Sequence, residues 1–272
     1  MRNFRKREIR AKASDFRSGC KIGKYGIIDI FEECDRHGFK LLRMPLGENS
    51  DLGFVLKRDG DIVIFTNSSM RLSREIFTLA HEFGHAALHF EQANSFVDDS
   101  VSLSEKSDDE MEQEANYFAV CMLLPQEKLK EFLDIETIGV KSEHLSAIDV
   151  TKIMTEFKVS YETVLNRLEN LSIIDENERK RLDNEKNEKR VGNLLNVTGG
   201  DRRLNVPSLE TAIPFEYLDY AIYNYNHGAI PLETLEKVLA CYNITKEDIS
   251  DKMADFIEKE VDLDELIGGT IA

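Results

Sequence analysis

The stretch that decides the fold runs from Arg74 to His89 and reads REIFTLAHEFGHAALH. An α-helix brings positions i and i+4 onto one face, which is where the motif H-E-x-x-H places its two imidazoles. At about 100° per residue, His81 and His85 lie opposite an apolar stripe that faces the core. The stripe consists of Ile76, Leu79, Ala80, Phe83, Ala87 and Phe90. The spacing predicts a helix with an apolar back and a polar front that carries both histidines.

The polar front is typical of a metal centre, and the alternative is an amphipathic helix that carries the motif by chance. His81 and His85 are candidate ligands, because two neutral imidazoles bind Zn²⁺ and leave coordination positions open. Glu82 lies at the edge of this front, where a carboxylate can act as a general base toward water. Gly84 leaves room for a neighbouring strand or a substrate. His89 is predicted to be a surface or supporting residue, because nothing in the sequence ends the helix before it.

A zinc hydrolase needs a third protein ligand, and a second helix, predicted over 109–124, offers three glutamates. Glu112 shares a face with Asn116, whereas Glu110 and Glu114 lie about 160° to 200° away. Glu112 is therefore the predicted third ligand. Asn116 is placed to hold the second ring nitrogen of a ligand histidine, or the carboxylate itself. The alternative is that all three glutamates are first-turn residues that complement the helix dipole.

Composition limits the classes of function. The chain has 272 residues and a formal charge of −16, which disfavours nucleic acid as a direct partner and favours a basic protein. It has no apolar run of the roughly 20 residues that a membrane span needs, and its basic start lacks the apolar segment of a secretory signal. We expect a cytoplasmic protein. Without any C-x-x-C pair, its cysteines are expected to be free thiols, not disulfides or a cysteine-type zinc site. They are Cys20, Cys34, Cys121 and Cys241.

The remaining pattern predicts an α+β fold with a small antiparallel sheet. In the first half of the chain we expect an amphipathic helix and then a strand (Phe39–Met44) within 23–44, and a hairpin of 54–57 and 62–65 that turns at Asp59-Gly60. An N-cap at Ser73 and an exposed loop over 92–108 follow. In the second half we expect helices over 126–174, a charged linker or solvated helix near 175–190, and amphipathic helices from 214 to 260. We predict a metallopeptidase domain at 1–130, a helical extension at 131–175, the charged segment at 176–205 and a small helical domain at 206–272.

Three segments resemble the ImmA/IrrE family of metallopeptidases. They are 74–89, then EQEANYFA at 112–119, and then LLP at 123–125. The strong resemblance covers 20–175, and 215–245 looks loosely like a helical tail of some members. The resemblance implies a gluzincin-like fold, with zinc on His81, His85 and Glu112 and with Glu82 as the base. Relatives of this type often cleave a repressor with a helix-turn-helix. The room before residue 20 is too short for such a domain, so the regulator is expected to be a separate chain.

Two functions remain in competition. The first is a zinc endopeptidase that cleaves a partner protein, with the strand at 62–65 as an edge for an extended substrate. The second is a regulatory module that binds a partner without cleaving it, with a structural or vestigial metal site. Tyr217, Tyr220, Tyr223 and Tyr225 in the C-terminal region are interpreted as core residues. The helices that carry them are a candidate surface for the partner or a second copy of the chain.

Overall fold

The chain folds as two units by its internal contacts, Met1–Ala212 and Ile213–Ala272. Among the described helices, none is long and apolar enough to cross a membrane. The computed structural model describes residues 1–50, 52–58, 60–90, 95–98, 109–137 and 145–253.

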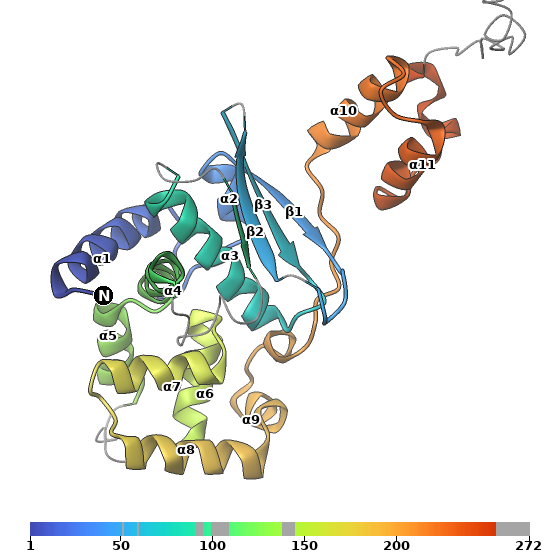
Figure 1. The fold of residues 1–272 in the computed structure, drawn as a ribbon. Helices are drawn as coiled ribbons and strands as arrows, with labels where there is room; N and C mark the ends of the chain where they lie inside the picture. The colour runs from blue at the N-terminus through green and yellow to red at the C-terminus, as the bar shows by residue number, and fades with distance from the viewer. Residues whose placement is uncertain (51, 59, 91–94, 99–108, 138–144, 254–272) are drawn as a thin grey trace, which may run out of the picture. The chain divides into compact units, whose positions relative to one another are not determined.

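A mixed four-stranded sheet forms one layer of the first unit (Figure 1). Its strands lie in the order β1-β3-β2-β4, and the predicted strand and hairpin are confirmed as β1, β2 and β3. β1 runs parallel to β3 while the other pairs are antiparallel, so the prediction of a purely antiparallel sheet was wrong. The strands are β1 (Phe39–Met44), β2 (Gly53–Arg58), β3 (Asp61–Asn67) and β4 (Ser95–Asp98).

Two expectations about the edges of this sheet were also wrong. The strand predicted as a free edge, within β3, is internal, because β1 and β2 pair with its two sides. The segment 92–108, predicted as an exposed loop, contains β4, which pairs with β2. The rest of that segment lies outside the described residues. The polar, acidic composition of 92–108 does not predict β4. This strand is stabilised by backbone pairing to β2, which local composition does not reveal.

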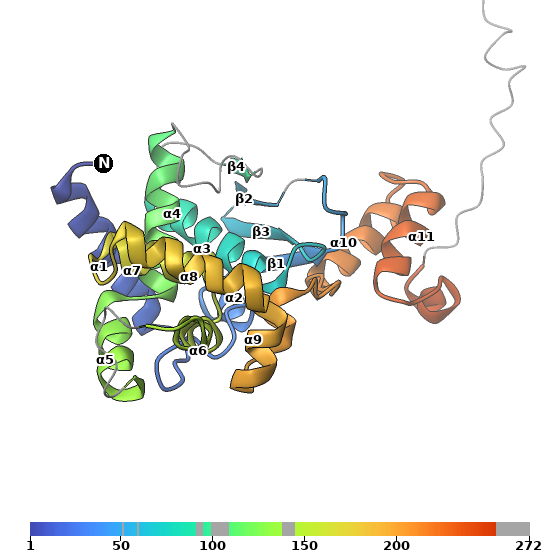
Figure 2. The ribbon, with the colours of Figure 1, turned by 90° about the horizontal axis from the view of Figure 1, so that it is seen from below.

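The helices of the first half of the chain include those that carry the candidate ligands. The polar stretch at the N-terminus forms α1 (Asn3–Ser18), and α2 is short (Glu32–Arg36). The helix of the histidines is α3 (Leu72–Leu88), and the second glutamate-bearing helix is α4 (Glu110–Leu123). α3 packs against β2 and β3 on one side and α4 on another, and α1 packs on α4 (Figures 1 and 2).

The helices predicted over 126–174 are present as three helices among the described residues of that range, and the charged stretch after them is also helical. One apolar core joins these elements to α1, α3 and α4, with buried side chains from Ile9 to Leu204. The elements are α5 (Gln126–Glu136), α6 (Ala147–Phe157), α7 (Tyr161–Asn170), α8 (Glu176–Lys189), α9 (Val191–Thr198) and the 3₁₀ turn η2 (Arg202–Asn205). The first unit is thus an α+β fold in which helical layers extend the core beneath the sheet.

The amphipathic helix predicted within 23–44 was wrong over most of its length, because only Glu32–Arg36 is helical there. Ile27, Ile30 and Cys34 are buried at helix-like spacing, as expected, but the chain reaches them through turns. A Cβ built at Gly26 would lie 2.1 Å from the carbonyl oxygen of Glu156. The segment is therefore pressed against the end of α6, and this tertiary contact overrides the local helical pattern.

The start of α3 is fixed by a distant segment and not by the predicted cap at Ser73. Arg71 is the N-cap residue, and the N–H of Leu72 donates to the carbonyl oxygen of Val206 at 2.9 Å. Inside the first turn, Glu75 accepts two hydrogen bonds from the Arg43 guanidinium of β1, at 2.8 and 3.0 Å. Both side chains are buried, so removing either would leave an uncompensated charge in the core.

α3 and α4 are tightly packed at Gly84, where a Cβ would lie 2.9 Å from the Cα of Ala115. Replacing Gly84 with alanine is expected to lower the free energy of unfolding by about 1–3 kcal/mol, the usual cost of overpacking. Urea unfolding measures the change. The matched control is Gly192→Ala in α9, where nothing lies within 4 Å of the added carbon. That variant should gain up to about 1 kcal/mol from helix propensity. Equal urea midpoints for Gly84→Ala and wild type would contradict the tight contact.

The second unit is a small helical bundle with its own core, built on Leu218, Leu235 and Ile249 among others. The predicted amphipathic helices are present as α10 (Phe215–Asn226), α11 (Leu232–Cys241) and the 3₁₀ segment η3 (Glu247–Lys252). The interpretation of its tyrosines as core residues was wrong for three of the four. The side chains that are 51–60% exposed are those of Tyr217, Tyr220 and Tyr223.

Candidate metal centre

Three predicted ligands meet between α3 and α4. The Nε2 atoms of His81 and His85 lie 2.8 Å apart, and each is 3.3 Å from one oxygen of Glu112. One donor atom of each residue lies within 4.8 Å of the other two. Both imidazoles are fully buried, and the Glu112 side chain is 13% exposed. Two imidazoles and one carboxylate converging on one point are a donor set that fits Zn²⁺.

Asn116, one turn after Glu112 on α4, orients the first imidazole. Its Oδ1 lies 2.9 Å from Nδ1 of His81, in the position predicted for it. An amide oxygen only accepts, so Nδ1 carries the proton and Nε2 presents its lone pair to the other donors. The hydrogen bond thus fixes the tautomer that a metal ligand requires.

His89 contacts the second imidazole, so the supporting role predicted for it agrees with the structure, whereas the alternative of a surface residue does not. α3 ends at Leu88, so His89 leaves the helical path, and its side chain is fully buried. Nδ1 of His89 lies 3.1 Å from Nδ1 of His85, and its Nε2 lies 3.1 Å from Oε2 of Glu114. A carboxylate accepts, so Nε2 of His89 donates and its Nδ1 can accept from His85. Nε2 of His85 is then left as the metal-facing atom.

The carboxylate behind His89 is itself held by the first helix. Nε and Nη2 of Arg5 on α1 donate to the two oxygens of Glu114 at 2.7 and 2.5 Å. A relay therefore runs from Arg5 through Glu114 and His89 to His85. A third histidine four residues after His85 is a weak sequence signal for this relay, but nothing local points to Arg5.

The ionisation of these groups follows from their contacts. Burial raises the pKa of Glu112, but hydrogen bonds and charge from His81 and His85 outweigh it, and the pKa falls to about 2. The hydrogen bond from Arg5 lowers the pKa of Glu114, while burial lowers the pKa of His89. Because the pKa of Glu114 is depressed, its pairing with Arg5 stabilises the fold above the ordinary glutamate pKa. That stability is lost as the pH falls through the folded-state pKa.

Glu82, the predicted base, lies on α3 beneath the start of β2 and is fully buried. A Cβ built at Gly53 would lie 2.7 Å from Oε1 of Glu82 and 2.5 Å from Cγ2 of Thr78. Only glycine lets β2 pass so close to the carboxylate. Gly84 was predicted to leave room for a strand or a substrate, but the element that approaches it is α4.

Replacing His89 with leucine is expected to weaken zinc binding by about 10–100-fold, the usual effect of losing a residue that orients a metal ligand. Leucine fills the buried space but gives His85 no acceptor. Competition with a chromophoric chelator measures the affinity. The matched control is His227→Leu on the second unit, which should leave the zinc affinity unchanged. An unchanged affinity in His89→Leu would show that His85 needs no support from His89.

Comparison with known proteins finds a family profile that covers the segment with the candidate ligands. The profile of the IrrE N-terminal-like domain matches residues 34–169, which include α3, α4 and the three donors. A curated relative, Metallopeptidase ImmA of Bacillus subtilis (strain 168), is 29% identical over 140 residues. The aligned part covers 51% of this chain and 79% of that protein. The profile match begins after α1, the helix that carries Arg5.

Proposed function

The chain belongs to the ImmA/IrrE family of metallopeptidases, and from this we propose that it is a zinc-dependent endopeptidase with a gluzincin-like active site. The observation that carries the proposal is the meeting of His81, His85 and Glu112. Three protein donors leave a coordination position open, as catalytic zinc sites do. His81, His85 and Glu112 would hold the ion.

The chain's own residues have separate tasks in peptide hydrolysis. When bound, a zinc ion polarises the scissile carbonyl and lowers the pKa of water. Glu82 accepts the proton of the attacking water and passes it to the leaving nitrogen. Asn116 and His89 keep the two ligand imidazoles in the required tautomer. The burial of all these side chains strengthens their electrostatic interactions by excluding bulk water.

The sheet suggests where an extended substrate would bind. The edge of β1 is occupied in part, since Arg43 and Ala212 exchange backbone hydrogen bonds. At the other end of the strand order, β4 pairs with β2 among the described strands. Asp98 of β4 pairs with Gly53, the residue that passes over Glu82. A substrate strand added to β4 would therefore run toward the base, as in β-augmentation.

We propose a helix-turn-helix transcriptional repressor, on a separate chain, as the protein substrate. Its cleavage would derepress mobile-element or stress genes. An enzyme that acts on such a DNA-binding protein would work in the cytoplasm. The formal charge of −16 supports this, because a DNA-binding surface is basic and is attracted to an acidic partner. The same charge disfavours direct binding of nucleic acid by this chain.

The alternative is a regulatory module that binds a partner without cleaving it. The exposed aromatic side chains of α10 support a binding role, since tyrosines are enriched in protein interfaces. Phe215, at the start of α10, is 62% exposed and belongs to this set.

The test mixes the purified chain, loaded with zinc, with a helix-turn-helix repressor encoded by a neighbouring gene, if the genome contains one. Appearance of two repressor fragments by gel and mass spectrometry is expected, and a chelator should prevent it. A matched reaction contains the same repressor and the chain carrying Glu82→Gln. Loss of repressor–DNA binding without fragments would favour the binding module. If neither repressor fragments nor a complex of the two proteins appear, this repressor is not the partner.

A further inference from the structure

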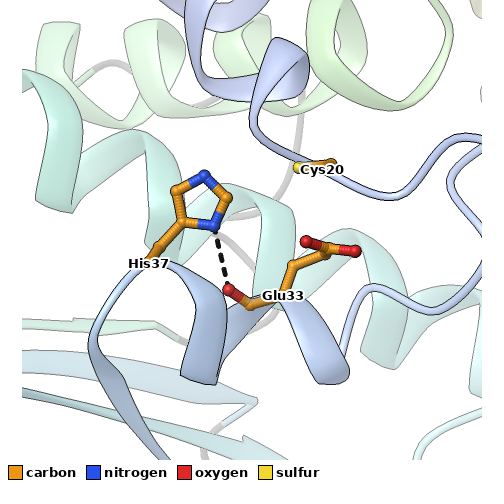
Figure 3. Close-up of side chains that lie close together, drawn as sticks. All are labelled: Cys20, Glu33 and His37. Carbon is orange, nitrogen blue, oxygen red and sulfur yellow. Dashed lines mark hydrogen bonds between the residues drawn. The ribbon is translucent and has the colours of Figure 1, made fainter.

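A second cluster of metal-type donors lies where α1 ends and α2 begins (Figure 3). Cys20, Glu33 and His37 each offer a donor atom, and these atoms lie within 4.8 Å of one another. The three residues are spaced 13 and 4 apart and include only one cysteine, so they match no sequence motif for zinc. The tertiary structure alone brings them together.

His37 presents one nitrogen as a lone pair. Its Nδ1 lies 2.9 Å from the backbone carbonyl oxygen of Glu33, the contact drawn in Figure 3. A carbonyl only accepts, so Nδ1 donates and Nε2 carries no proton in the neutral ring. Phe16 stacks on the imidazole at 3.9 Å between ring centroids and holds its plane. A Cβ built at Gly19 would lie 3.1 Å from Nε2, so this nitrogen lies beside the backbone that leads to Cys20.

Glu33 is a fully buried carboxylate, and one of its two oxygens accepts a hydrogen bond. Oε1 accepts a hydrogen bond from the N–H of Lys21 at 2.9 Å. Oε2 is buried and accepts no hydrogen bond from the residues that the structure describes. Its ion-pair partner, Arg36, has Nε at 3.6 Å and a side chain that is 47% exposed. Such a pair compensates a buried charge poorly, so Glu33 favours a second cation.

Cys20 supplies the sulfur ligand. Burial, together with the charge of Glu33, raises the pKa of the thiol to about 12, so the free side chain is neutral. A divalent cation would reverse this preference, and its binding would release the thiol proton. One thiolate and one carboxylate neutralise a divalent ion, and the imidazole adds a neutral ligand. The filled site would thus carry no net charge, which suits a buried position.

We propose that Cys20, Glu33 and His37 form a second metal site that binds Zn²⁺ and ties the end of α1 to α2. A sulfur, nitrogen and oxygen donor set is one that zinc accepts at about 2.0–2.3 Å. Tetrahedral bonds of that length put donor atoms roughly 3.5 Å apart, so modest side-chain rotations complete the site. A water molecule would fill the fourth position, and the ion would fasten the end of α1, the helix whose Arg5 supports Glu114.

The first test counts zinc ions on the full-length chain after dialysis against zinc-free buffer. The wild type should hold two per chain, and Cys20→Ser and His37→Gln should each hold one. The matched control is Cys121→Ser, another buried cysteine, which should keep two. His81→Ala should hold one, and His81→Ala with Cys20→Ser none. A count of one in the wild type, or two in Cys20→Ser, would overturn the proposal without touching the peptidase centre.

A second measurement detects the thiolate ligand directly in the wild type. Co²⁺ replacing zinc should give the near-ultraviolet sulfur-to-metal band that only a thiolate ligand produces. This band should persist in His81→Ala and disappear in Cys20→Ser. Its absence from the wild type would reject Cys20 as a ligand. Added zinc should also raise the melting temperature of His81→Ala, and failure to do so would reject a site that stabilises the fold.

Discussion

Glu82→Gln should retain zinc and lose cleavage of the protein substrate by about 10²–10⁴-fold, the usual contribution of a general base. Glutamine has nearly the same shape and fits under Gly53, but its amide cannot take a proton from water. The zinc donors His81, His85 and Glu112 are unchanged in this variant. Single-turnover cleavage and zinc content, measured on the same preparation, separate the chemistry from metal binding.

Glu82→Asp is the companion to that variant. It keeps a carboxylate but withdraws it by one methylene, so its rate should fall between those of the wild type and Glu82→Gln. Cleavage by Glu82→Gln at the wild-type rate would show that another group takes the proton. Loss of zinc in Glu82→Gln would instead mean that this residue helps to hold the ion.

Glu112→Gln should abolish stable zinc binding and, with it, cleavage. The carboxylate supplies the only negative charge among the three donors, and an amide oxygen is a poor replacement for it. We expect the zinc affinity to fall by more than the 10–100-fold typical of residues that merely orient a ligand. Competition with a chelator measures the affinity, and circular dichroism checks the fold.

The matched control for Glu112→Gln is Glu110→Gln. Both glutamates lie in the first turn of α4, so both variants remove a charge that complements the helix dipole. Glu110 is exposed and should leave zinc binding intact. Equal zinc loss in the two variants would assign the effect to the dipole, and retention of zinc by Glu112→Gln would remove Glu112 from the ligand set.

Helical periodicity predicts most of the candidate metal centre. Spacing on α3 put His81 and His85 on one side, and spacing on α4 separated Glu112 from Glu110 and Glu114. These inferences succeed because side chains four residues apart share a helix face whatever the helix packs against. The same reasoning placed Asn116 behind a ligand histidine, where it forms its hydrogen bond.

Periodicity failed where a distant segment determines the local structure. The apolar residues of 23–36 have helical spacing, yet only Glu32–Arg36 is helical. The rest of the segment is held in turns by the contact of Gly26 with α6. Ser73 was predicted as the N-cap of α3, but the helix begins earlier, where the N–H of Leu72 donates to the carbonyl oxygen of Val206. Local propensity is a weak preference that such tertiary contacts override.

The sequence by itself determined the strands of the hairpin, the helix of the histidines and the candidate donor residues on α3 and α4. Only the tertiary structure decided how those donors are supported, through His89, Glu114 and Arg5, and which strands form the edges of the sheet. It alone also assembled Cys20, Glu33 and His37. The physical reason is range: periodicity reports neighbours within a helix or strand, whereas a buried charge is stabilised by whichever partner the packed core brings to it.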